Sequence, residues 1–191
     1  LEHDLTRLIS NLADPEKPVV ALLTDLPMQG TQFDQYTPWL AIDGMRQFFD
    51  VKFLDKDAKE LPDNISILIV AGAHTIQDEL LYEMDQFVVN GGKALVFADP
   101  LAESMALSGP AAGQLPPPGV GQAAIEPLLN AWGVTVERGQ FVGNLDDAIR
   151  VGFPTPETGQ QVAVDYVAWL DLQGERFSQD DTITAQLQRI V

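Results

Sequence analysis

The sequence contains no cysteine among its 191 residues. This absence excludes thiol nucleophiles, disulfides, iron–sulfur clusters and zinc sites built on cysteine. Histidine is also scarce, because His3 and His74 are the only two, so few catalytic triads can be assembled. Neither a Gly-x-Ser-x-Gly elbow nor a His-Glu-x-x-His zinc motif occurs. The sequence therefore carries no signature of nucleophilic or zinc-dependent hydrolysis.

The sequence also has few positively charged residues. Lys and Arg number 11 against 28 Asp and Glu, which gives a formal net charge of −17. Phosphate backbones require a basic surface, so nucleic acid is excluded as a partner, and an anionic membrane surface would repel the chain. A hydrophobic content of 46% with 20% charged residues is typical of a globular protein.

Long apolar runs are missing as well. The longest covers residues 65–71 and is interrupted by Ser66, far below the roughly 20 residues that span a bilayer. The opening residues lack the basic, apolar and small-residue parts of a signal peptide. We expect the chain to be a segment of a longer protein, so the missing membrane segments say nothing about that protein.

Short apolar runs alternate with one-sided helical patterns over the first hundred residues. Uninterrupted apolar runs of this length are typical of strands buried on both faces of a parallel sheet. The pattern predicts an α/β fold, namely a doubly wound, mostly parallel sheet with helices on both faces, in a three-layer, flavodoxin-like arrangement. Right-handed crossovers predict the strand order 51–54, 18–23, 65–71, 94–98, with a helix at residues 5–12, a second starting near Trp39 and a third over residues 76–88 that ends at Asn90-Gly91-Gly92.

We predict one α/β domain over residues 1–191, with its core at about 15–100. A proline- and glycine-rich excursion at 99–122 interrupts it, and an α/β extension, expected to be truncated, fills 123–191. The extension is predicted to hold a helix at 123–132, strands at 134–137, 140–142 and 162–170, a short helix at 146–150, and a last helix that opens with a capping-box pattern at 178–181.

Polar residues follow three of the predicted strands. His74 lies shortly beyond the predicted strand at 65–71, and Asp25 and Asp99 follow the ends of two other strands, at the edge where open α/β sheets place their binding crevice. Two carboxylates and a histidine are suited to ligand contact, to acid–base chemistry or to a metal. The plainer alternative is structural, since Asp-Pro and similar pairs end strands, and His74 with Thr75 could cap the next helix.

The string Gly119–Ala124 matches the spacing of a dinucleotide-binding fingerprint. That motif needs a buried strand before its first glycine, whereas three prolines precede this one. We interpret the string as a loop that leads into a helix and predict no cofactor and no metal. A nucleotide-binding domain remains a third functional class, which calorimetry with a dinucleotide would test.

Several segments together form a pattern that resembles the extracytoplasmic domain of the gliding-motility-type ABC transporter auxiliary family. The main one runs from the strand at residue 65, through a helix that ends in Phe87-x-x-x-Gly91-Gly92, to the strand that ends in Asp99-Pro100. The resemblance covers most of the chain, and its motifs are structural. The other matching segments are residues 3–9, 17–23, 128–134, 141–148, 169–172 and 180–184.

This resemblance implies an extracytoplasmic or periplasmic domain at the inner membrane, tethered by membrane helices of the full-length protein. It implies that the domain acts together with the permease and ATPase subunits of an ABC system and contacts a polysaccharide or surface component. A homo-oligomer is compatible with this resemblance. The family's domain is similar in fold to class I glutamine amidotransferases. Their activity requires a cysteine nucleophile, which this chain lacks.

The leading interpretation is a non-enzymatic interaction domain that recognises a partner protein or a glycan-like ligand. Recognition is expected from the strand-end loops at 24–38, 71–76 and 99–122, because binding residues concentrate on loops held by a rigid scaffold. The alternative is a metal-assisted hydrolase or lyase that uses Asp25, His74 and Asp99. The tentative binding residues are Asp25, Gln32, Phe33, Tyr36, His74, Thr75 and Asp99.

Overall fold

The computed structural model of the chain describes residues 5, 9, 16–30, 37–55, 57–99, 124–137, 140–155 and 158–191. It divides into two compact units, residues 1–140 and 141–191, and each unit is considered by itself below. The division falls inside the predicted extension at 123–191.

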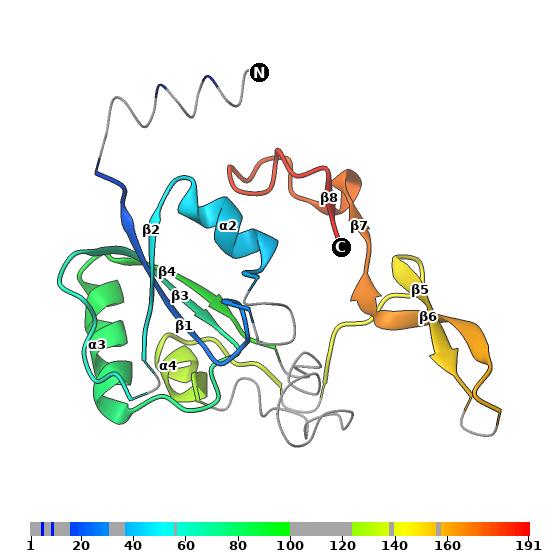
Figure 1. The fold of residues 1–191 in the computed structure, drawn as a ribbon, viewed down its shortest axis with the longest axis horizontal. Coiled ribbons are helices and arrows are strands. Elements are labelled where there is room, and N and C mark those ends of the chain that lie inside the picture. The colour runs from blue at the N-terminus through cyan, green and yellow to red at the C-terminus, as the bar shows by residue number, and fades with distance from the viewer. Residues whose placement is uncertain are drawn as a thin grey trace. The chain divides into compact units, whose positions relative to one another are not determined.

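The first unit contains a four-stranded sheet and three described helices (Figure 1). All three strand pairs are parallel, and the order is β2-β1-β3-β4, which confirms the predicted α/β class and strand order. The elements are β1 (Val19–Thr24), α2 (Leu40–Arg46), β2 (Asp50–Phe53), β3 (Ile65–Ala71), α3 (Asp78–Val89), β4 (Lys93–Phe97) and α4 (Glu126–Ala131).

The two faces of the sheet are covered by different helices. On one face, Ala21, Leu23, Leu68 and Val70 lie in a core cluster with α3 and α4. On the other face, alternate residues of the same strands pack with Ile42 of α2. A strand directs successive side chains to opposite faces. Because both faces are covered, the two central strands are apolar at every position except Thr24 and Ser66.

Helix α3 ends where the sequence predicts. The backbone N–H of Gly92 donates to the carbonyl of Phe87 at 2.8 Å, and that of Gly91 donates to Val88 at 2.9 Å. Gly91 has a φ of +91°, which is the left-handed conformation that glycine adopts without a steric cost at a helix end. The chain then enters β4.

The second unit contains an antiparallel hairpin of β5 (Ala148–Pro154) and β6 (Gln161–Leu170). The registered pairs Ile149–Tyr166, Val151–Val164 and Phe153–Val162 place apolar side chains on one face of the hairpin. No described side chain of this unit is fully buried. Two shorter strands, β7 (Leu172–Gln173) and β8 (Arg189–Ile190), pair antiparallel around a 3-10 helix at Gly174–Arg176.

Local side-chain hydrogen bonds explain two predictions that are wrong. At 146–150 the amide of Asp146 donates to Oδ1 of Asn144 at 3.0 Å, forming a turn, and the alternating residues that follow form β5 in place of a helix. At 178–186 the amide of Ile183 donates to Oδ1 of Asp181 at 2.7 Å, and the structure there is bends and turns. Such bonds offer the backbone an alternative to helix.

The two strands expected just before the second unit are also absent. Residues 134–137 and 140–142 are described and make no ladder with any described strand. The amide of Val134 instead donates to the carbonyl of Leu129 at 2.8 Å, which extends the turn after α4. Of the predicted helix at 5–12, the structure describes Leu5 and Ile9, both helical.

Candidate functional site

The candidate site lies at the carboxyl edge of the sheet in the first unit. Strands β1 and β3 pair in parallel with Thr24 opposite Ala71, so their carboxyl ends are level. The amide of Asp25 donates to the carbonyl of Gly72 at 3.3 Å, which joins the two loops directly after the strands. The register of the sheet therefore brings the loop after β1 against the loop after β3.

Asp25 and His74 are in contact at this edge. Oδ2 of Asp25 accepts a hydrogen bond from the backbone N–H of His74 at 2.7 Å and lies 2.8 Å from its ring Nδ1. With the Asp25 carboxylate ionised, it can only accept, and Nδ1 is then the donor. The Asp25 side chain is 14% exposed and that of His74 is 27% exposed, so the pair is partly shielded from water.

The second ring nitrogen of His74 is the unusual atom of the pair. Nε2 is buried and has no hydrogen-bond partner within the part of the chain that the structure describes. Leaving a buried polar atom unsatisfied is costly, and each such atom in a native fold requires an explanation. His74 therefore combines a fixed ring orientation with an unused polar atom.

A glycine allows the two loops to approach. Gly72 has a φ of +58°, and a Cβ built there would lie 2.8 Å from Cγ of Leu26. Both the backbone conformation and the space exclude a side chain at this position. The amide of Leu26 donates to Oγ1 of Thr24 at 3.0 Å, which holds the chain in its turn after β1.

An apolar cavity of about 310 Å³ opens at the same edge, on the face that carries α2. Gly72 and Asp99 both line it, so the carboxyl ends of β3 and β4 meet there. Its apolar lining includes two side chains from the loop after β1 and two from β4, namely Leu26, Met28, Leu95 and Phe97.

The lining of this cavity was not predicted from the sequence. Leu95 and Phe97 are 48% and 56% exposed, although they alternate along a strand as core residues do. One signal in the sequence could have indicated this lining. The strand that holds Leu95 and Phe97 is followed by the proline- and glycine-rich segment 99–122, where a helix that covers the sheet would be expected.

The other predicted site residues have different positions. Thr75 is exposed, and the N-cap of α3 is Gln77, with no side-chain cap hydrogen bond, so His74 and Thr75 do not cap that helix. Gln32, Phe33 and Tyr36 lie outside the described residues, as do residues 100–123, which include most of the Gly119–Ala124 string.

The metal-site alternative receives no support from the geometry. Among the residues that the structure describes, no group of three or more His, Asp or Glu side chains is arranged to hold a metal ion. Asp25, His74 and Asp99 are all described, so they do not form such a set. Asp25 and His74 form a hydrogen-bonded pair.

Comparison with known families decides the class of the protein. A family model described as an ABC-type uncharacterized transport system matches residues 17–191. The chain belongs to this family. The match agrees with the resemblance noted from the sequence. The family consists of auxiliary proteins of ABC-type transport systems. No curated protein and no solved structure gives a significant match. Within the described ranges of this family member, no helix is both long and apolar enough to cross a bilayer.

Proposed function

We propose that this chain is a non-enzymatic, extracytoplasmic auxiliary domain of an ABC-type transport system, of the gliding-motility type. It contacts a subunit of that system through the loops at the carboxyl edge of its sheet. The family match over residues 17–191 supports the transport role. The observation that carries the mode of action is the apolar cavity at the carboxyl edge.

The character of the cavity favours a protein partner over a glycan at this edge. Its wall is aliphatic and aromatic, and Asp99 is the one charged side chain among the described residues that line it. Apolar anchors that fill such cavities provide most of the affinity at protein interfaces, whereas sugar hydroxyls need hydrogen-bond partners. A leucine or phenylalanine of a permease-associated segment fits this lining.

The Asp25–His74 pair has a supporting role in this proposal. It joins the two loops through one carboxylate oxygen, which fixes the position of Gly72 on the cavity wall. A binding surface that is ordered beforehand loses less conformational entropy on association. The dyad therefore acts as a positioning element, without a chemical step.

Photo-crosslinking in intact cells tests the proposal. A photoreactive amino acid is placed at Met28 or Phe97, and, as a matched control, at Tyr82, which is exposed on α3 away from the cavity. We expect a permease or ATPase-complex subunit to be captured from the two cavity positions only. Identical products from all three positions, or none from the cavity, would contradict the proposal.

A ligand test separates this function from metal-assisted hydrolysis. Divalent cations (Mg²⁺, Mn²⁺, Zn²⁺) are added singly and the melting temperature is followed. A cation that binds only the native state would raise the melting temperature. We expect no such shift. A shift that disappears in both His74→Ala and Asp99→Asn would favour the hydrolase or lyase alternative.

A further inference from the structure

A second cavity lies at the opposite edge of the same sheet. It has a volume of about 520 Å³ and is bordered by residues 61–66, which lead into β3, and by the end of α3, which leads into β4. We call it the amino-edge groove. The side chains that matter for its chemistry are Leu61, Asp63, Ile65, Glu83, Phe87 and Asn90.

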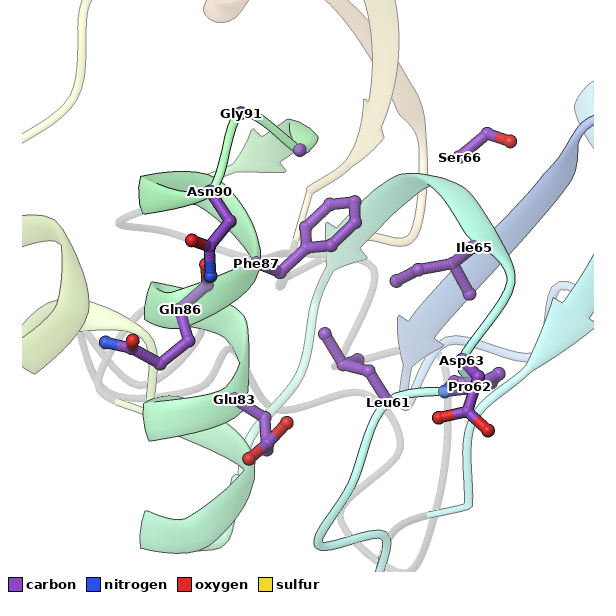
Figure 2. A pocket seen from close by; sticks show the side chains of 11 residues that line it. Leu61, Pro62, Asp63, Ile65, Ser66, Glu83, Gln86, Phe87, Asn90 and Gly91 are labelled. Carbon is purple, nitrogen blue, oxygen red and sulfur yellow. The ribbon is translucent and has the colours of Figure 1, made fainter.

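The floor of the amino-edge groove is apolar and fixed to the core. Leu61, Ile65 and Phe87 are partly buried and pack against the cluster beneath α3 and α4, and Figure 2 shows them converging between α3 and the segment before β3. A Cβ at Gly92 would lie 2.5 Å from Cε1 of Phe87. The aromatic ring therefore occupies its position because residue 92 has no side chain.

The rim of the groove carries two carboxylates. Figure 2 shows Glu83 on the α3 side and Asp63 on the opposite side. Neither carboxylate has a hydrogen bond or ion pair with another residue in the described part of the chain. Their charges remain available to a ligand that enters between them.

The amides of the groove add acceptors more than donors. Nε2 of Gln86 donates to Oδ2 of Asp85 at 3.2 Å, and Nδ2 of Asn90 donates to the carbonyl of Gln86 at 2.8 Å. Each amide nitrogen thus uses one of its two N–H groups within the chain, while the amide oxygens and the carboxylates only accept. The groove is rich in acceptors, negatively charged and floored by an aromatic ring.

We propose that the amino-edge groove binds an arginine side chain of a partner protein. A guanidinium is planar, permanently charged and has five N–H donors with no acceptor, and it stacks on aromatic rings. It therefore complements the carboxylates, the amide oxygens and Phe87 together. A lysine ammonium supplies charge without the planar stacking surface, and a neutral sugar supplies hydroxyls that need donors as well as acceptors.

The charge of the whole chain supports this occupant. With a formal net charge of −17, the protein attracts basic segments before contact and repels acidic ones. This proposal does not depend on recognition at the carboxyl edge, because the groove lies at the other end of the strands. Either proposal can fail while the other holds.

NMR titration of the ¹⁵N-labelled chain tests the proposal at low salt. The probe is the peptide acetyl-Gly-Arg-Gly-amide, compared with its lysine counterpart and with cellobiose. We expect the arginine peptide to shift the amide signals of residues 61–66 and 83–92, and to do so at lower concentration than the lysine peptide. Asp63→Asn should weaken apparent binding about two- to fivefold, as expected for one exposed ion pair.

A matched substitution makes the result specific. Asp57→Asn removes one exposed carboxylate that does not line the groove and should leave binding unchanged. Equal losses in Asp63→Asn and Asp57→Asn would show general charge attraction only and would overturn the proposal. So would shifts caused by cellobiose in place of the arginine peptide, equal affinity for both peptides, or no shifts at all.

Discussion

Oδ2 of Asp25 lies 2.7 Å from the backbone nitrogen of His74 and 2.8 Å from its ring nitrogen Nδ1. One carboxylate oxygen therefore holds both the main chain and the side chain of a residue 49 positions later. The two residues follow adjacent parallel strands, so the contact links neighbouring loops across the edge of the sheet. We expect the order of this edge to depend on this acidic side chain, beside the backbone hydrogen bond from Asp25 to Gly72.

Replacement of Asp25 tests that dependence. Asp25→Ala removes the acceptor and leaves two N–H groups of His74 unsatisfied, so we expect a loss of about 1.5–3 kcal/mol in the free energy of unfolding. Asp25→Asn should cost less, because its amide oxygen still accepts from the backbone N–H. Urea denaturation measures both, with Asp57→Ala as an exposed control expected within about 0.5 kcal/mol of the parent chain. A loss in Asp25→Ala no larger than in the control would show that the contact contributes nothing.

Gly72 provides a test of the close approach between the loops. Gly72→Ala faces an unfavourable φ of +58° and a contact of 2.8 Å with Leu26. Gly133 has a φ of +79° with no atom within 4 Å of the added Cβ, so Gly133→Ala measures the backbone cost alone, about 1–2 kcal/mol. We expect Gly72→Ala to be the more destabilising of the two in urea denaturation.

A double substitution separates the steric part. In the background of Leu26→Ala, the added methyl group meets less of a side chain, so Gly72→Ala should cost less than in the parent chain. A double-mutant cycle isolates this coupling between the two positions. Additive losses would mean that the backbone conformation accounts for the whole effect.

The contact between α4 and α3 gives a third prediction. Nε1 of Trp132 donates to Oδ1 of Asp85 at 3.0 Å. Trp132→Phe keeps an aromatic ring and removes this donor, so it should lower the free energy of unfolding by about 0.5–1.5 kcal/mol. Asp85→Asn retains an oxygen that accepts and should cost less than Asp85→Ala. Equal losses in the free energy of unfolding for the two Asp85 variants would show that the hydrogen bond with Trp132 does not contribute to stability.

Glu79 gives a prediction about pH. A hydrogen bond with its own backbone, and then the hydrogen bond and charge of Lys59, lower the pKa of Glu79 below its ordinary value of 4.5. Because the pKa is lower in the folded state, the stabilisation is present above the unfolded pKa and is lost as the pH falls through the folded pKa. Lys59→Gln should raise the pKa of Glu79 part of the way back, measured by ¹³C NMR titration of the side-chain carboxyl. An unchanged titration would exclude Lys59 as a cause.

Much of the sheet could be predicted from the sequence. The strand at residues 65–71 has the predicted limits, and the strand order is the predicted one, because unbroken apolar runs separated by one-sided helices permit few arrangements. The second unit was harder to predict. Asp181 and Asn144 form short-range hydrogen bonds with the backbone. Such bonds compete with helix formation, and the spacing of apolar residues does not reveal them.

The candidate site was predictable in part for a related reason. The ends of parallel strands are level, so the proximity of Asp25 and His74 follows from strand order alone. The apolar cavity beside them depends on which side chains remain uncovered, and Leu95 and Phe97 look like ordinary core residues in the sequence. The amino-edge groove depends on how Phe87 lies over Gly92, which no spacing rule predicts.

The fully buried side chains all lie between Val19 and Leu129, and none belongs to the second unit among the residues described. An isolated two-stranded hairpin is only marginally stable in water. Amide protons of β6 should therefore exchange with deuterium far sooner than those of β3, through local openings that leave the sheet intact. We therefore expect the parallel sheet to remain folded for much longer between opening events than the hairpin does.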